Sequence, residues 1–507
     1  MKFPSLLLLV SVIFSPFFPM GAWAQTTAQI PLSKILSELA GDLKEDFSWG
    51  EECQKRFDFY YQRLANFTPK EIVNENNHEV IKQTFQLRIS IYQVIRDHQQ
   101  ALDQNETCVN SIRSVTRSLR YLEDYLIQQS LEKSPIRELE GEWPYLQVNP
   151  DFPDFKGKEQ LLSGDILLTQ GNDFFSSAVT RLASVATQFG HSSFLYKDAN
   201  GGLFTVEALK NGTAVRPFKE HQDGGNSRAI VLRHRDPQKA KEAVTALVNY
   251  LENFRQQNGY DVPYDFKFEL EDHRRLFCTE AIRLGFDLAG IKDNPLPRYK
   301  SHFTVGMVNF LHSFGIPVDQ SNAANYPVFA PGDLEFDPQF DIVAEWRDPA
   351  QLSSAMMRDM VTSKTFQWMG EKNYVYYRPA DIWIKSNLAW AARHMCCTRR
   401  YFSQEIPYNM GIQQMKIYLM MEKVGKILFN YLENLQEKNQ LLLSYNQMLT
   451  ELEKLRENDY KKWIHYQSLR KEILKKEQEK NHNYKTIMAK DIPYFHQWLH
   501  PSDPLDL

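Results

Sequence analysis

The chain has 507 residues, a length that predicts about three domains at roughly 150 residues per domain. Hydrophobic residues make up 43% of it, and 9 Trp, 24 Tyr and 32 Phe supply ample material for packed cores, which excludes wholesale disorder. The net charge of −4 gives the whole protein no attraction to nucleic acid or to an anionic membrane.

Residues 1–24 have the pattern of an export signal. Lys2 supplies a positive charge, an apolar run extends from Leu6 to Phe18, and Ala22-Trp23-Ala24 forms a small-x-small cleavage site. The alternative, an N-terminal membrane anchor, is disfavoured because two prolines interrupt a run that is already short for a bilayer. No later stretch approaches the roughly 18 apolar residues of a spanning helix. We therefore expect an exported protein, periplasmic or secreted, with no transmembrane segment after signal removal.

Residues 25–148 are predicted to form a helical domain, because apolar residues recur at helical spacing and few glycines interrupt them. Cys53 and Cys108 are the only cysteines of this region. In an oxidising compartment they are a candidate disulfide, although sequence does not give the separation of their Cα atoms. Residues 149–154 combine prolines with turn formers and are predicted to be a linker.

Residues 158–347 change character and are predicted to form a mixed α+β domain. Short runs typical of strands alternate with turns, and two helical stretches follow. The predicted strands cover 165–169, 192–196, 203–208 and 229–232, and the predicted helices cover 238–254 and 279–289.

Residues 350–495 are again predicted to be helical. Within them, 435–480 mixes apolar positions at three-four spacing with dense charge, which suggests a long amphipathic hairpin or a short coiled coil.

Three residues of the mixed domain could carry chemistry together. Cys278 lies where an apolar segment turns into a helical pattern, and the N–H groups of a helix start stabilise thiolate. His191 opens a predicted strand and could pair with that thiolate as a general base and acid. Glu207 lies in the next strand and could orient the imidazole. Each has a simpler interpretation: a buried apolar Cys, a half-buried polar His and a surface Glu.

The register of the hairpin formed by these two strands decides whether His191 and Glu207 can meet. A turn centred on Ala199 sets His191 directly opposite Glu207, side by side on one face. A two-residue Asn200-Gly201 turn instead pairs Glu207 with Phe194 and sends His191 to the other face. We predict the first register.

Five motifs occur in an order that resembles a known family. They are Leu-Leu-Ser-Gly-Asp-Ile-Leu-Leu (161–168), Gly-His-Ser-Ser-Phe (190–194), Val-Glu-Ala (206–208), Tyr-Asp-x-x-Phe (264–268) and Phe-Cys-Thr-Glu (277–280). In this order they resemble the circularly permuted papain-like hydrolases of the NlpC type, specifically the bacterial YiiX/YaeF group. Gly190 stands where that family often has Ser before His, and Thr279 where it often has Ser after Cys.

The resemblance covers about residues 160–345 and implies an α+β fold: a permuted papain-like domain with an antiparallel sheet, flanked by an N-terminal helical bundle and long C-terminal helices. It also implies Cys278 as nucleophile, His191 as base and Glu207 as its orienting partner. Tyr264 and Asp265 could shape the pocket or hold a strand end. His273, five residues before Cys278, is a substitute base.

The predicted function is that of an exported cysteine hydrolase, an amidase or peptidase that works through a thioester acyl-enzyme on an amide such as a cell-wall peptide. No metal or organic cofactor is required. One alternative is a lipid esterase or acyltransferase of the related permuted fold. Another is an interaction protein whose helical flanks bind a protein partner and whose papain-like domain is inactive. The state of Cys396 and Cys397 stays open.

Overall fold

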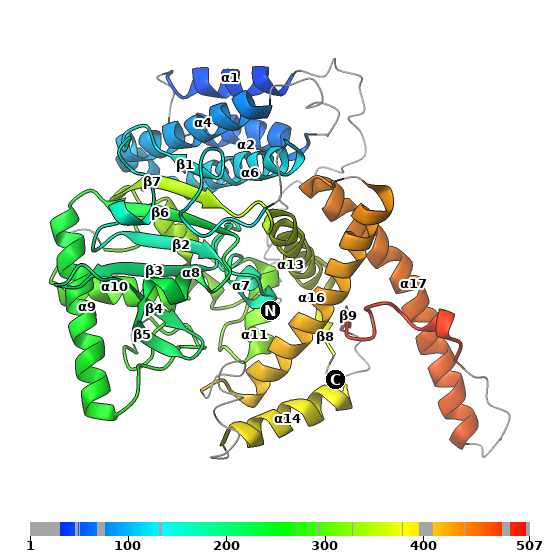
Figure 1. The fold of residues 1–507 in the computed structure, drawn as a ribbon. Helices are drawn as coiled ribbons and strands as arrows, with labels where there is room; N and C mark the ends of the chain where they lie inside the picture. The colour runs from blue at the N-terminus through cyan, green and yellow to red at the C-terminus, as the bar shows by residue number, and fades with distance from the viewer. Residues whose placement is uncertain are drawn as a thin grey trace, which may run out of the picture.

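The computed structural model describes twelve stretches of the chain (Figure 1): residues 31–45, 49, 51–67, 77–130, 134–270, 272–292, 295–326, 328–377, 379–394, 409–440, 442–478 and 487–502. The predicted export signal at residues 1–24 lies outside the described residues, as do Cys396 and Cys397.

A seven-stranded antiparallel sheet forms the centre of the fold, with the strand order β1-β7-β6-β2-β3-β4-β5. Its strands are β1 (Leu146–Val148), β2 (Ile166–Gln170), β3 (His191–Lys197), β4 (Leu203–Leu209), β5 (Gly212–Pro217), β6 (Arg228–His234) and β7 (Phe340–Arg347). Helices make up much of the remaining chain, so the predicted α+β class is confirmed.

The two faces of the sheet are covered differently. Helices α9 (Pro237–Asn258) and α10 (Cys278–Leu288) pack on the face that carries Phe194, whose ring contacts Phe286 of α10 at a centroid distance of 5.8 Å. The other face carries a smaller apolar cluster, which includes Leu195 and is closed by residues 139–161 and the short helix α8 (Phe218–Gln222). The middle strands β2 and β6 are buried on both sides, which explains their apolar runs at 166–168 and 229–232.

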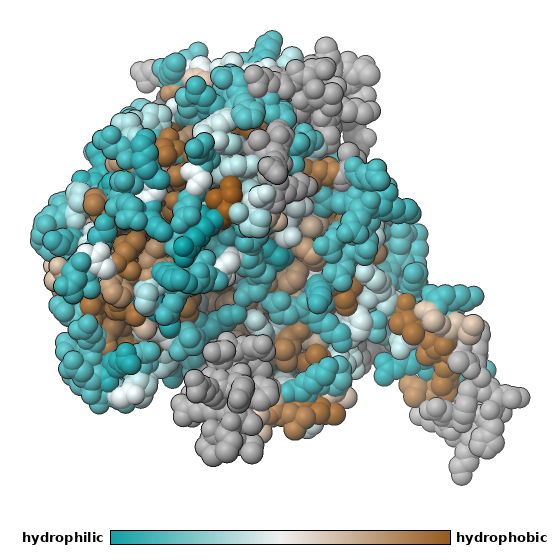
Figure 2. All heavy atoms as spheres, in the orientation of Figure 1, coloured by the Kyte–Doolittle hydropathy of each residue, from teal (hydrophilic) through white to brown (hydrophobic). Residues whose placement is uncertain are grey.

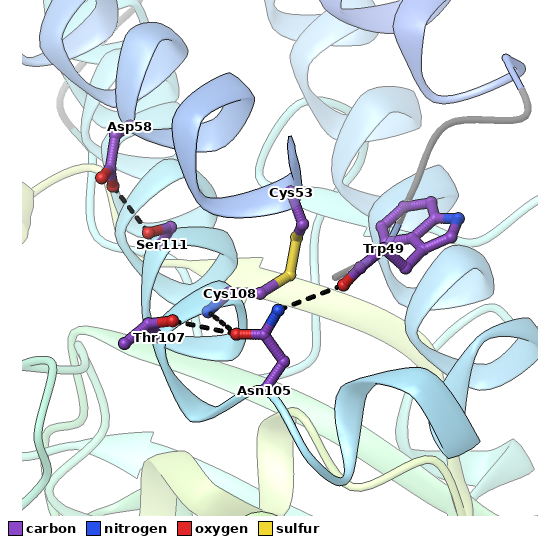
Figure 3. The surroundings of a disulfide bond; sticks show 7 residues. All are labelled: Trp49, Cys53, Asp58, Asn105, Thr107, Cys108 and Ser111. Atoms are coloured by element: carbon purple, nitrogen blue, oxygen red, sulfur yellow. Dashed lines mark hydrogen bonds between the residues drawn. A yellow bond between two sulfur atoms is a disulfide. The ribbon is translucent and has the colours of Figure 1, made fainter. Parts of the chain in front are cut away.

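The N-terminal helices form a layer beside β7, at the top of Figure 1. They are α1 (Leu32–Asp42), α2 (Glu51–Ala65), α4 (Asn77–Asp97), the single turn α5 (Gln99–Leu102) and α6 (Glu106–Ser130). Cys53 of α2 and Cys108 of α6 form a disulfide with a Cα separation of 5.5 Å (Figure 3). Beside the disulfide, the side chain of Asn105 accepts a hydrogen bond from the backbone N–H of Cys108 and donates one to the carbonyl of Trp49. These two hydrogen bonds connect the start of α6 to the segment just before α2.

A buried network of charges joins this helical layer to the sheet. Arg88 of α4 donates to Glu123 of α6 at 2.8 Å, Arg120 of α6 donates to Glu345 of β7 at 2.6 Å, and Arg347 of β7 also contacts Glu123. All five side chains are buried. Removing one partner from such a network leaves a charge without compensation, which typically costs about 3–5 kcal/mol. The helical layer and the sheet are therefore held together by charge as well as by apolar packing.

The C-terminal part of the chain lies to the right of the sheet in Figure 1. It contains α11 (Val305–Phe314), α12 (Pro331–Glu335), α13 (Leu352–Lys372), α14 (Ala380–His394), α16 (Ile412–Asn439) and α17 (Tyr445–Gln478), with a two-stranded sheet of β8 (Tyr374–Tyr376) and β9 (Leu499–Pro501). Of these helices, α13 and α16 pack against the short helix α7 (Phe174–Val179). The helix α16 ends at Gln440 with positive φ, and α17 returns after a short turn and projects from the body at the lower right of Figure 1.

The face shown in Figure 2 is mostly hydrophilic, and hydrophobic side chains gather over α14 at its lower edge. Trp383, Ile384 and Leu388 of this helix are at least half exposed. None of the described helices has both the length and the apolar composition needed to cross a bilayer.

Five strands, β1, β5, β7, β8 and β9, were not predicted from the sequence, and β8 lies within the region 350–495 that was predicted to be helical. β1 lies in the region predicted to be wholly helical, and it pairs with β7, so the sheet begins before the predicted linker. In β7 the buried residues Glu345 and Arg347 interrupt the apolar pattern, and only the charge network described above explains their burial.

Candidate active site

Cys278 is the first residue of α10, one position before the predicted helix start. Its side chain is buried and it is a free thiol. Glu280, in the first turn, accepts a hydrogen bond from the backbone N–H of Phe277 at 3.3 Å. Burial raises the pKa of Glu280 to about 9, so at neutral pH this carboxyl is protonated and places no negative charge beside the sulfur. The free N–H groups of the helix start therefore act on Cys278 without opposition.

His191, the first residue of β3, lies between the sulfur and a carboxylate. Its Nε2 is 2.9 Å from Oε2 of Glu207, and the ring also hydrogen-bonds to Cys278. Since Nε2 is engaged by Glu207, Nδ1 is the nitrogen left for the thiol. Burial lowers the pKa of His191, but the hydrogen bonds to Cys278 and Glu207 outweigh it and raise that pKa to about 9.

The same contact acts on the thiol in the opposite sense. Burial alone would raise the pKa of Cys278, but the hydrogen bond and positive charge of His191, together with the backbone N–H of Ser192, outweigh burial and lower it. Both directions favour a thiolate–imidazolium pair over a neutral thiol and imidazole, and the thiolate is the form in which a cysteine attacks a carbonyl.

The hairpin register differs from the prediction. Phe194 pairs with Val206 and Lys197 with Leu203, which centres the five-residue turn on Asn200 rather than on Ala199. The carboxylate of Asp198 closes this turn by accepting from the N–H groups of Asn200 and Gly202. The predicted direct opposition of His191 and Glu207 is therefore wrong.

The observed register still brings the imidazole and the carboxylate together. Continued by one residue, it sets Glu207 opposite Ser193, so His191 is a diagonal neighbour on the same face. The alternative pairing of Glu207 with Phe194 is wrong as well. The β3–β4 pairing ends at Phe194, which leaves the N–H of Ser192 to face the sulfur of Cys278.

Glu207 is buried and has a second histidine on its other side. Nδ1 of His221, from α8, lies 3.1 Å from the same Oε2 that contacts His191, and Thr205 donates to Oε1 at 3.1 Å. Burial raises the pKa of a carboxyl, but the charge of His221 and the hydrogen bonds from His191 and His221 outweigh it and hold the pKa of Glu207 well below its usual range. Glu207 is therefore an ionised acceptor.

The network continues to a residue outside the predicted hydrolase domain. Nε2 of His221 lies 3.3 Å from Oε1 of Glu138, and Asn226 donates to the other oxygen of Glu138 at 2.8 Å. Burial disfavours a charged His221, but Glu138 and Glu207 outweigh it and raise the pKa of His221 well above its usual value. Four buried or half-buried groups thus form one chain, His191–Glu207–His221–Glu138.

A pocket of about 390 Å³ opens beside this chain. His191, Glu207, Tyr264 and Phe175 line it, as does Lys210, which forms an ion pair with Asp173. Cys278 is not among the residues that line this pocket, and only 4% of its surface is exposed.

Gly190 is required at the entrance to β3. A Cβ atom at Gly190 would lie 2.4 Å from the carbonyl oxygen of Ser176 in α7 (Phe174–Val179). A side chain here would push apart the start of β3 and α7, two walls of the same pocket. Position 190, next to His191, therefore has room only for glycine.

Of the remaining candidate residues, Tyr264 lines the pocket, whereas Asp265 and His273 do not. Tyr264 is also close enough to Cys278 to feel its charge. Asp265 accepts from the backbone N–H groups of Lys267 and Glu269, so it holds a turn. His273 is half exposed and faces Glu280 at 3.5 Å, away from the pocket lining, so the structure does not place it as a substitute base.

Sequence reasoning missed His221 and Glu138. His221 follows Glu207 by 14 residues and Glu138 lies 83 residues before His221, so no local spacing links them. Their sequence surroundings gave no signal either, because Glu138 lies within Arg-Glu-Leu-Glu (137–140) and His221 within Lys-Glu-His-Gln-Asp (219–223), both typical of an exposed surface, yet both residues are buried.

The described residues contain no cluster of three or more His, Cys, Asp or Glu side chains suited to hold a metal ion. Comparisons with protein-family models, with curated proteins and with solved structures found no match for this chain.

Proposed function

We propose that the protein is a cysteine hydrolase that cleaves an amide or ester through a thioester on Cys278. The observation that carries this proposal is the continuous hydrogen-bonded chain from the sulfur of Cys278 through His191 to Glu207, located at a helix start and beside a pocket. A buried structural cysteine has no need of a charged imidazole, whereas a nucleophile does.

The reaction has two stages. The thiolate of Cys278 attacks the carbonyl carbon and forms a C–S bond, while backbone N–H groups at the start of α10 stabilise the developing oxyanion. His191 then gives its proton to the leaving nitrogen or oxygen as the original acyl bond breaks. In the second stage His191 takes a proton from water, the hydroxide adds to the thioester, and the C–S bond breaks to release a carboxylic acid.

Glu207 and His221 act as positioning residues in this scheme. Glu207 fixes the ring of His191 so that Nδ1 faces the sulfur, and His221 fixes the carboxylate of Glu207. The resemblance of the five sequence motifs favours an amide substrate, with cell-wall peptide as the substrate class, in an exported protein.

Acylation by p-nitrophenyl acetate tests the proposal without knowledge of the natural substrate. Wild type is expected to release a burst of p-nitrophenolate and to carry an acetyl group on the Cys278 peptide in mass spectrometry. Cys278→Ala should abolish the burst, and His191→Ala should slow it about 10²–10⁴-fold because the base is lost. His273→Ala is the matched control, a histidine near Cys278 in sequence but outside the pocket.

The proposal is wrong if Cys278 is acetylated no faster than free cysteine, or if His191→Ala and His273→Ala behave alike. Both outcomes would leave Cys278 as a buried residue of the α10 packing. Circular dichroism of each variant separates loss of chemistry from loss of fold.

A further inference from the structure

One cation of the pocket differs from the others in its surroundings. Lys210 is paired with Asp173 at 3.0 Å, and the two histidines share Glu207. Arg216, from β5, also lines the pocket, yet no carboxylate of the described residues lies within 4.0 Å of its guanidinium. The positive charge of Arg216 is therefore available to pair with an anionic ligand.

The course of the Arg216 side chain brings this charge to the acid end of the site. Arg216 is paired with Thr205 and Ala214 with Glu207 in the β4–β5 ladder, so the side chain of Arg216 leaves the sheet on the same face as that of Glu207. Its Nη2 donates to Oδ1 of Asn211 at 3.2 Å, back along β5. Ala214, the strand partner of Glu207, lies between Arg216 and Asn211 along the chain.

The guanidinium is held but not saturated. Asn211 accepts from Nη2 alone, and Nε has no hydrogen-bond partner among the described residues. Glu220, the next carboxylate along the chain, lies at the exposed edge of the pocket and makes no ion pair with Arg216. A guanidinium offers five N–H donors in a planar fork, which matches the two oxygens of a carboxylate.

We propose that Arg216 forms a carboxylate-binding subsite, so that the preferred acyl donor carries a carboxylate a few bonds from the carbonyl that Cys278 attacks. This rests on the proposed function and names its substrate class. A single guanidinium balances one negative charge, and the neighbouring Glu220 repels a second one, so the site fits a monoanionic carboxylate better than a phosphate dianion.

A matched pair of alkylating probes tests this subsite at Cys278. N-chloroacetyl-β-alanine and N-chloroacetyl-β-alaninamide have the same reactive carbon and differ only in a terminal carboxylate or carboxamide. In both, the thiolate displaces chloride and forms a thioether. The two rates are followed on the Cys278 peptide by mass spectrometry, in wild type, Arg216→Gln, Arg216→Lys and Lys219→Gln. Lys219 is an exposed neighbour on α8 that does not line the pocket.

We expect the ratio of the carboxylate rate to the amide rate to fall about tenfold in Arg216→Gln, the loss that one charged hydrogen bond accounts for. Arg216→Lys should keep part of the preference, since the charge remains without the fork. Lys219→Gln should keep all of it. The amide probe lacks the carboxylate, so its rate in each protein is the reference of the ratio, and its reaction with Cys278 also shows that each variant is folded at the site.

An equal ratio in wild type and Arg216→Gln overturns the subsite, as does an equal fall in Lys219→Gln, which would show a general field rather than a site. Failure of the proposed function has a different signature. In that case the amide probe reacts with wild-type Cys278 no faster than with a free thiol, whatever the ratio.

Discussion

The charge of His221 should control the protonation of His191. In the structure the two rings are stacked with centroids 6.5 Å apart on either side of Glu207. Two unit charges at this separation repel by about 2.5 kcal/mol at an effective dielectric constant of about 20. Removal of the charge at His221 should therefore make it harder, not easier, for His191 to lose its proton.

The variant His221→Asn removes this charge and keeps an N–H donor near the position of Nδ1. Because Glu138 would then lose its imidazole partner, the double variant His221→Asn/Glu138→Gln removes both charges and leaves no unpaired buried carboxylate. His191 is much nearer to His221 than to Glu138 along the chain of contacts, so the loss of the positive charge should dominate. We expect the titration midpoint of His191 to rise by about one pH unit from its value of about 9.

The titration is measured by ¹H–¹⁵N correlation spectra of protein with ¹⁵N-labelled histidine, in which the His191 signals are identified by their absence from His191→Gln. Glu138→Gln alone is the control of opposite sign, since it removes a negative charge and should lower the midpoint. If the double variant leaves the midpoint unchanged or lowers it, then His221 is neutral in the native protein and the charged chain is refuted.

Three further substitutions test other parts of the structure. Gly190→Ala should slow acylation of Cys278 by up to about 10²-fold because its Cβ cannot fit against α7, whereas Gly41→Ala, with open space around it, should have no effect in the same burst assay. Arg347→Met should lower the free energy of unfolding in urea by about 3–5 kcal/mol, and the same change at the exposed Lys219 should not alter it measurably. Cys108→Ser should lower the free energy of unfolding by about 2–5 kcal/mol, since its disulfide closes a long loop with a sequence separation of 55. A reductant should lower the free energy of unfolding of wild type by a similar amount and leave that of the variant unchanged.

Local sequence patterns predicted the elements that carry the catalytic candidates. The helical spacing after Cys278 predicted α10, and the short β-type runs around His191 and Glu207 predicted β3 and β4, each within one or two residues of its observed bounds. These patterns are informative because each element buries one face against its neighbours, so apolar residues recur in the sequence with the period of the helix or the strand. The shared face of His191 and Glu207 followed from the same logic, although the register was off by one position at the centre of the turn.

Long-range pairing could not be predicted in this way. The register depended on Asp198, whose side chain closes a five-residue turn, a detail that the choice between Ala199 and Asn200-Gly201 did not include. The burial of the charged residues of β7 is explained only by their partners in α4 and α6, which lie more than 200 residues earlier in the chain. A polar residue in an apolar run signals a partner but does not identify it.

The central claim is that Cys278 is a thiolate held by His191 at neutral pH. Its most direct test is the rate of alkylation by iodoacetamide at the Cys278 peptide as a function of pH, in wild type and in His191→Ala. Since the pKa of Cys278 is lowered, the wild-type rate should stay high to a lower pH than the rate of an ordinary thiol, whereas the rate of His191→Ala should already fall as the pH drops below about 8.5. A wild-type profile that follows an ordinary thiol, and that His191→Ala leaves unchanged, would contradict the account.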